Sequence, residues 1–275
     1  MTTATAVTPA TGPDAATVET QPVTLTRVVG SEWLKFRTLR STIAVLGAAA
    51  VGMIAIALIV AYNTRHITAN IQPDDHVPSS TMQGYYLGQL LVGALGILFV
   101  SGEYSTGMIR STLAAVPKRL LVLWAKLVVF TVVTGVTMLV ACLVAFVAAQ
   151  ALISNYRTGY SLTDPTVLRI VIGTGVYLTL LGVLGAALAW IVRSTPGALV
   201  AYVAVILVLP ILFSTVLGAW GKDVAEFMPT VAGGSFIRSI GEPPSLGPWT
   251  GLVVLVAWVV AGVAVAAIEL RRRDA

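Results

Sequence analysis

The sequence predicts an all-α polytopic membrane protein with six transmembrane helices. Of its 275 residues, 57% are hydrophobic and only 11% are charged, whereas a soluble domain carries about 25% charged residues. Six stretches without Asp, Glu, Lys or Arg are each longer than the roughly 20 residues that a helix needs to cross a bilayer. Lipid offers the backbone no hydrogen-bonding partner, so these stretches should be helical. Strands of a membrane barrel would instead alternate polar and apolar residues over about ten positions.

The six predicted spans follow the charge-free stretches. They lie at residues 43–62, 84–100, 121–149, 168–192, 197–219 and 249–268. The third helix can run over residues 118–150, which at about 1.5 Å per residue is roughly 50 Å, so it should extend beyond the bilayer or tilt strongly. Only residues 193–196 separate the fourth and fifth spans, which predicts a tight antiparallel hairpin. Pro210 interrupts the fifth span.

The distribution of Lys and Arg predicts that both termini face the cytoplasm. With the N-terminus inside, 12 of the 17 basic residues fall on the cytoplasmic side and five on the outer side. Basic residues favour the cytoplasmic side of membrane proteins, so the net charge of +5 reflects topology. A nucleic-acid partner would require a basic patch with elements that read grooves or stack on bases, and none is visible.

Three segments make up the predicted domain organisation. Residues 1–23 are rich in Thr, Ala and Pro, which is typical of a disordered cytoplasmic tail. Residues 24–40 predict an amphipathic elbow helix lying on the inner membrane surface. Its apolar face holds Leu25, Val29, Trp33 and Phe36, and its charged residues fall largely elsewhere. Residues 41–275 form the six-helix transmembrane domain.

Two outer loops leave alternatives open. The first contains Asp74, Asp75 and His76, but a short run on one loop does not fix three metal ligands, so a solvated loop is the preferred interpretation. The last, residues 220–248, either folds into short helices that enter the outer leaflet or stays an exposed loop.

Near the outer end of the second span, three side chains also allow two interpretations. Tyr85, Tyr86 and Gln89 either line a substrate path or belong to the aromatic belt at the membrane surface, and the belt is preferred. In the same span, Gly84 and Gly88 form a GxxxG motif that allows close helix contact.

The sequence contains no motif for catalysis or for a cofactor. A P-loop needs Ser or Thr after Gly-Lys, but the only Gly-Lys pair, Gly221-Lys222, precedes Asp223. No HExxH or GxSxG motif occurs, and Cys142 is the single cysteine. We therefore expect a chain that is not an enzyme and that binds neither a metal nor a cofactor.

Two segments carry a more specific pattern. SEWLKFRTLRST, residues 31–42, leads into the first span, and SGEYSTGMIRSTLAAVPKRLLVLWAK, residues 101–126, links the second and third spans. In the second segment Gly107 allows a turn, residues 108–115 can form a short helix, and Pro117 suits the first turn of the next helix.

Together with the six spans, these segments resemble the membrane-spanning permease subunits of type-two ABC exporters of bacteria. The resemblance implies a plasma-membrane location, a second permease copy or paralogue as partner, and separately encoded ATP-binding subunits as the motor. It implies short re-entrant helices in the last outer loop. It also implies that the first inner loop and the elbow helix meet the ATPases. The residues concerned are Glu103, Tyr104, Gly107, Arg110, Pro117, Lys118 and Arg119 in the coupling region and Glu32, Trp33, Lys35 and Arg37 in the elbow helix.

The expected function is export of a hydrophobic or amphipathic compound, driven by a separate ATPase. Spans without a charged relay fit such a cargo better than an ion. An ion-coupled secondary transporter and a non-transport membrane protein remain as alternatives. The inner-loop basic residues could also serve topology alone, which explains Lys118 and Arg119 better than it explains the rest of the segment.

Overall fold

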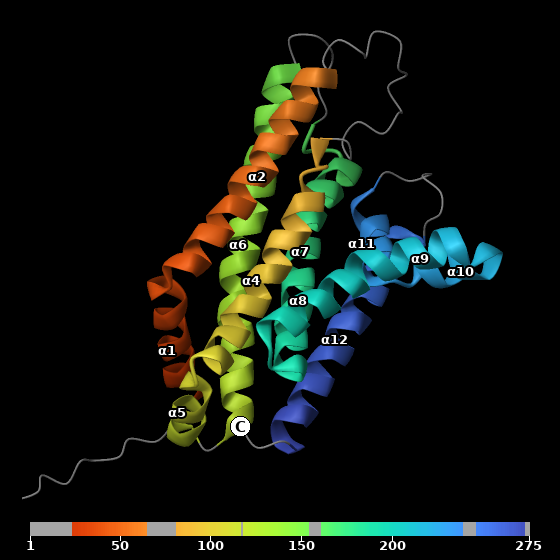
Figure 1. Ribbon diagram of the computed structural model, residues 1–275. Helices are drawn as coiled ribbons and strands as arrows, with labels where there is room; N and C mark the ends of the chain where they lie inside the picture. Colours follow the sequence, from red (N-terminus) through yellow and green to blue (C-terminus); the bar gives the residue numbers. More distant parts are fainter. Residues whose placement is uncertain (1–23, 65–80, 117, 154–160, 239–245, 273–275) are drawn as a thin grey trace, which may run out of the picture.

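The computed structural model describes residues 24–64, 81–116, 118–153, 161–238 and 246–272 (Figure 1). Within these ranges all regular structure is helical, and six helices are long and apolar enough to cross a membrane. The predicted all-α fold with six spans is thereby confirmed. The predicted tail at residues 1–23, the run Asp74 to His76, and Pro117 lie outside the described residues.

The spans overlap the predicted ones and extend further at most ends. They are α2 (Arg40–Thr64), α4 (Tyr85–Ser105), α6 (Arg119–Ile153), α7 (Pro165–Val192), the run Thr195–Val216, and α12 (Pro248–Arg272). The 35 residues of α6 confirm the long third helix. The α4 helix continues five residues past its predicted end, so that Glu103 belongs to the helix and not to a loop.

The centre of the bundle is the contact between α4 and α7. These two helices bury 61% and 72% of their apolar windows, whereas α2 buries only 22%. Their backbones touch through glycines: a Cβ added to Gly96 would lie 2.2 Å from the Gly182 carbonyl oxygen, and one added to Gly185 would lie 2.5 Å from that of Gly93. A Cβ added to Gly84 would lie 2.8 Å from the Met53 carbonyl oxygen of α2, whereas Gly88 faces the Leu178 side chain of α7. Gly84 of the predicted GxxxG motif therefore allows a close approach to α2, while the closest contact of α4 with α7 lies one to two turns beyond the motif.

The turn between α7 and the fifth span is as short as predicted. Arg193 ends α7 in a left-handed conformation (φ 57°), and the Ser194 side chain caps the next helix by accepting from the Gly197 amide. Because a capped two-residue turn reverses the chain at once, the two helices start as an antiparallel hairpin.

The fifth span is three consecutive pieces, α8 (Thr195–Val203), the π-helical turn η2 (Ala204–Val208) and α9 (Leu209–Val216). The wide turn precedes Pro210, which cannot donate a backbone hydrogen bond and so leaves a carbonyl without its helical partner. The hydroxyl of Thr230 donates to the Ile206 carbonyl at 2.9 Å and takes that place.

The described part of the segment predicted as the last outer loop contains two short helices, which confirms the helical content of the first alternative. These are α10 (Gly218–Glu226) and α11 (Pro229–Ile237). The Trp258 indole of α12 donates to the Phe227 carbonyl at 2.8 Å between them, and Arg169 of α7 donates to the carbonyls of Phe236 and Arg238. Figure 1 shows α9 and α10 extending to one side of the bundle, while α2 and α6 reach furthest from α5.

The segment before the first span is a separate helix, α1 (Leu25–Thr38), which ends where the backbone becomes extended at Leu39. It packs beside α6 at the end of the bundle where α5 (Met108–Ala115) lies (Figure 1). We call this the α5 end. The buried residues of α1 are Val28, Glu32 and Phe36, whereas Trp33 is 48% exposed. Of the predicted apolar face only Phe36 is fully buried, and a glutamate takes the central inward position.

Candidate functional site

Four charged side chains from three helices form one cluster near the α5 end. The Lys126 ammonium of α6 donates to Glu32 Oε2 at 2.7 Å and to Glu103 Oε1 at 3.0 Å. The Lys35 ammonium of α1 donates to Glu32 Oε1 at 2.7 Å and to the same Glu103 oxygen at 2.8 Å. These four residues, named the ion cluster below, tie the helix before the first span to α4 and α6.

The ion cluster is almost closed to solvent. The side chains of Glu32 and Lys126 are 0% and 1% exposed, that of Glu103 is 8% exposed and that of Lys35 is 24% exposed. Two carboxylates balance two ammonium groups, as burial requires, because an unpaired buried charge costs several kcal/mol. Burial lowers the pKa of Lys35, but its hydrogen bonds to Glu103 and Glu32 outweigh this effect and raise the pKa above its ordinary value.

Local sequence explains how each helix supplies its charge. Glu32 and Lys35 are three residues apart and so lie on one face of α1. Lys126 lies about two turns into α6, on the side that faces α1 and α4. Its ammonium also sits 4.3 Å from the centre of the Phe99 ring, which Phe36 meets edge-on at 5.1 Å. Aromatic rings therefore cover the cluster on its apolar side.

The short helix α5 lies against the same cluster. It begins at Gly107, whose φ of 72° is a left-handed conformation that suits glycine. Ile109 is buried, and the Thr112 hydroxyl accepts a 3.4 Å hydrogen bond from Lys35. Met108 and Arg110 are exposed on its other side. One face of α5 thus contacts the cluster, and the opposite face is open to solvent.

The remaining predicted site residues surround this region without joining the cluster. Tyr104 packs edge-on against Trp190 at 5.9 Å, with the Arg193 guanidinium 5.8 Å from its ring centre. Arg119 donates to the Leu270 carbonyl of α12 at 3.5 Å. The other described members are exposed: Trp33, Arg37, Gly107, Arg110 and Lys118.

Sequence reasoning missed Lys126 as a site residue. The basic count assigned it to topology, and the spans were expected to contain no buried charge, whereas both α4 and α6 contain one. The available signal was its position, because Lys126 lies well inside an otherwise apolar helix and has no acidic residue within its own span. A buried lysine in such a place requires carboxylates from other helices, and Glu32 and Glu103 are the nearest acidic residues in the two conspicuous motifs.

A second buried polar group lies between α4, α7 and α8 and contains no charge. The Tyr177 hydroxyl donates to Gln89 Oε1 at 2.7 Å, and the Tyr202 hydroxyl donates to the Gln89 backbone carbonyl at 2.8 Å. Gln89, Tyr177 and Tyr202 are named the neutral cluster below. Tyr85 is buried against Tyr177, while Tyr86 is about half exposed. Of the three residues flagged in the second span, two therefore point inward and only Tyr86 suits a surface belt.

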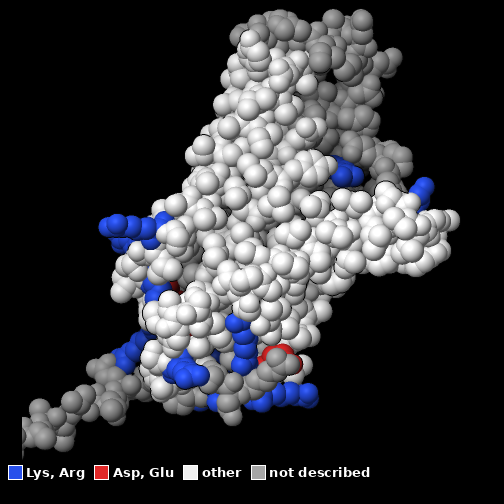
Figure 2. All heavy atoms as spheres, viewed as in Figure 1, with Lys and Arg blue, Asp and Glu red and all other residues white. Residues whose placement is uncertain are grey.

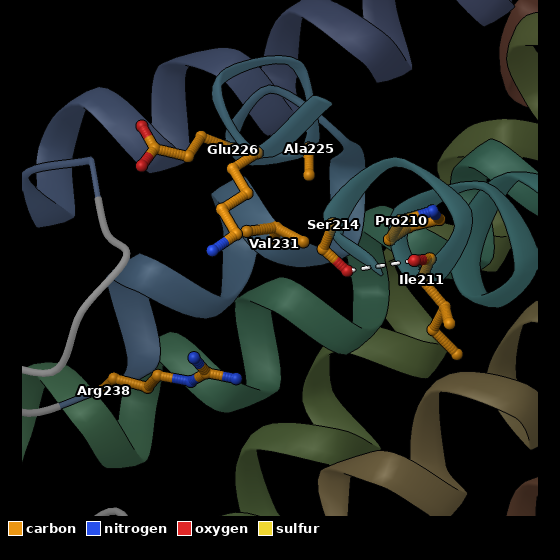
Figure 3. Close-up of a pocket in the computed structure, with 8 residues that line it drawn as sticks. Pro210, Ile211, Ser214, Ala225, Glu226, Val231 and Arg238 are labelled. Carbon is orange, nitrogen blue, oxygen red and sulfur yellow. Dashed lines mark hydrogen bonds between the residues drawn. The ribbon is translucent and has the colours of Figure 1, made fainter. Parts of the chain in front are cut away.

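A cavity of about 580 Å³ lies among α9, α10 and α11 (Figure 3). Its lining combines apolar with charged side chains: Pro210, Ile211, Ser214, Lys222, Ala225, Glu226, Val231 and Arg238. In Figure 3 the Glu226 carboxylate and the Arg238 guanidinium lie on different sides, and Ser214 donates to the Ile211 carbonyl at 3.1 Å. A cavity of this size and mixed chemistry can take an amphipathic small molecule.

The charged surface is concentrated at the α5 end. In Figure 2 most of the blue Lys and Arg side chains gather there, while the side of the bundle above them is almost entirely white. Among the residues that the structure describes, no three His, Cys, Asp or Glu side chains lie together as metal ligands. No protein-family model matches this chain, and no curated protein matches it either. The geometry and the sequence motifs therefore carry the functional argument.

Proposed function

We propose that this chain is the permease subunit of an ATP-binding-cassette exporter of the bacterial plasma membrane, powered by a separate ATPase. The observation that carries the proposal is the ion cluster. A helix that precedes the first span is joined by buried ion pairs to two spans, and the inner-loop helix α5 rests on the same pairs. A chain without a motor of its own needs such a joint if work done elsewhere is to move its spans.

The ATPase would contact the exposed faces of α1 and α5. Met108 and Arg110 on α5, and Trp33 and Arg37 on α1, point away from the bundle and offer apolar and cationic groups to a partner. A displacement of α5 passes to α4 through the short turn at Gly107 and to α1 through Lys35. Because the ion cluster joins α1, α4 and α6, these helices should move together and not separately.

The cargo in this proposal is a hydrophobic or amphipathic compound. The cavity among α9, α10 and α11 supports an amphipathic compound, since it combines an apolar wall with Lys222, Glu226 and Arg238. A second permease, identical or a paralogue, completes the pathway, and both termini face the cytoplasm. This topology puts the α5 end on the same side as the ATPase.

Co-expression with an ATP-binding-cassette ATPase from the same genome, chosen first from neighbouring genes, tests the proposal. The two proteins should copurify, and the permease should change the rate of ATP hydrolysis. Arg110→Glu should abolish copurification, because it reverses an exposed charge on α5 without touching the bundle. Arg272→Glu, an equal change on the exposed end of α12, should leave copurification intact. The proposal fails if no ATPase copurifies and if substitutions at Glu103 and at Arg110 both leave the rate of ATP hydrolysis unchanged.

The buried charges also require a comparison with an ion-coupled transporter. Intramembrane ionisable residues often mark ion paths. The two ammonium groups and two carboxylates of the ion cluster, however, cancel in charge, and the cluster lies near the α5 end of the bundle. The neutral cluster further along α4 offers only an amide and two hydroxyls. Transport that an uncoupler abolishes and ATP depletion spares would favour ion coupling. Normal function in cells that lack every partner ATPase would favour a non-transport membrane protein.

A further inference from the structure

A basic pocket and an apolar groove meet between α6 and α12 at the α5 end. The pocket, of about 450 Å³, is lined by Lys118, Arg119, Leu120, Leu121, Trp124 and Arg271. The groove, of about 570 Å³, has walls from α6 and α12 and a floor from Leu180 and Val183 of α7. Trp124 lines both spaces, so the pocket and the groove adjoin at its indole.

The groove has the dimensions of one acyl chain. Its lining follows α6 from Trp124 up to Val132, and the pocket adds the turn below, from Leu120. On α12 the lining runs from Val259 to Ala267 and the pocket adds Arg271. Each path covers about 12 residues, or roughly 18 Å at 1.5 Å per residue. One leaflet of the hydrocarbon core is about 15 Å deep, half of the roughly 30 Å bilayer core.

The chemistry of the lining changes sharply along this path. The pocket has three cations, and the described residues that line it include no acidic side chain. The groove above it is lined by apolar side chains and by Thr131 as its one polar residue among those described. Trp124, which is 48% exposed, lies at the transition, where an indole suits the boundary between headgroups and acyl chains. Arg119 is held beside α12 by its hydrogen bond to the Leu270 carbonyl.

We propose that this site binds one anionic phospholipid, with its phosphate against Lys118, Arg119 and Arg271 and an acyl chain in the groove. Basic pockets between transmembrane helices bind anionic headgroups, and the attached groove distinguishes a lipid from a free anion. The inference rests on the geometry of α6, α7 and α12 and is independent of the proposed transport function. It gives Lys118 and Arg119 a role between α6 and α12 that is separate from the ion cluster.

Native mass spectrometry of the full chain in detergent tests the site. Phosphatidylglycerol and phosphatidylcholine with the same acyl chains are titrated separately. The wild-type chain should bind one phosphatidylglycerol in preference to phosphatidylcholine. The triple variant K118Q/R119Q/R271Q should bind phosphatidylglycerol about fivefold more weakly for each cation removed, and on the order of 100-fold more weakly in all. Its affinity for phosphatidylcholine should stay unchanged.

Matched variants distinguish binding at this site from a general electrostatic attraction between the basic chain and anionic lipids. R37Q/R40Q/R272Q removes three exposed arginines that do not line the pocket, so it should retain the wild-type preference. The charge-conserving R119K/R271K should also retain most of it, which shows that positive charge is required at these positions, while unchanged phosphatidylcholine binding by K118Q/R119Q/R271Q shows that this variant is folded. Ala264→Trp fills the groove and should weaken the binding of both lipids to the same extent. Undiminished preference in K118Q/R119Q/R271Q, an equal loss in R37Q/R40Q/R272Q, or full competition by glycerol phosphate would each overturn the proposal.

Discussion

The ion cluster and the neutral cluster are both buried polar groups attached to α4, yet they join different kinds of element. The ion cluster uses two carboxylates and two ammonium groups to attach α1, a helix outside the six spans, to α4 and α6. The neutral cluster uses one amide and two hydroxyls to join spans α4, α7 and α8 to one another. The first lies beside the polar end of the bundle and the second lies between the spans.

The difference follows from what each environment allows. A charge can be buried only where its partners are complete, and this requirement makes α1, α4 and α6 dependent on one another. Hydroxyl and amide groups cost less to bury, so the neutral cluster can lie between the glycine-lined helices α4 and α7 without balancing charges. Removal of one side chain should therefore lower the free energy of unfolding more in the ion cluster than in the neutral cluster.

The largest effect should come from Lys126→Met. The change leaves two buried carboxylates that share Lys35 alone, and loss of one partner of a buried pair costs about 3–5 kcal/mol. Unfolding in mixed detergent–SDS micelles, followed by tryptophan fluorescence, measures this loss. The double variant K126M/E103Q leaves Glu32 and Lys35 as a neutral pair, so it should be more stable than K126M alone. A K126M protein as stable as wild type would show that the cluster does not form.

A smaller effect should come from Gln89→Leu in the neutral cluster. The Tyr177 hydroxyl then loses its acceptor inside the bundle, at a cost of about 1–3 kcal/mol. The same unfolding measurement applies. Adding Tyr177→Phe removes the unpaired hydroxyl and should restore much of the stability. If Q89L proves more destabilising than K126M, the ranking of the two clusters is wrong.

The fold could be predicted from sequence because charge spacing determines where helices can cross lipid. The ion-pair partners of the buried charged residues could not be predicted from sequence, because these partners come from helices that are distant in the sequence. Glu32 was assigned outside the apolar face of α1, since a helical pattern alone treats a carboxylate as solvent-facing. Its burial becomes favourable only through its ion pairs with Lys126 and Lys35. The same reasoning ended the second span at residue 100, although Glu103 extends α4 once it is paired. Pro210 was flagged, but the hydroxyl that bonds a carbonyl of the π-helical turn before it comes from Thr230 on a different helix.

The smallest effect should come from Lys35→Met, and pH should modulate it. Lys35 is the most exposed member, and Lys126 still contacts both carboxylates in its absence, so the loss near neutral pH should be about 1 kcal/mol. The pKa of Lys35 is raised in the folded chain, so its contribution is complete below its ordinary pKa of about 10.4 and is lost as pH rises through the higher folded value.

Unfolding of wild type and K35M between about pH 8 and pH 11 measures this dependence. The stability difference should be constant at the lower pH and shrink at the alkaline end, as the wild-type ammonium loses its proton. For Q89L the difference from wild type should not follow this Lys35 titration, because Gln89 has no titratable side chain. A K35M difference that grows with alkaline pH would mean that Lys35 is more easily deprotonated in the folded chain, and the ion cluster would then not hold it as an ammonium between two carboxylates.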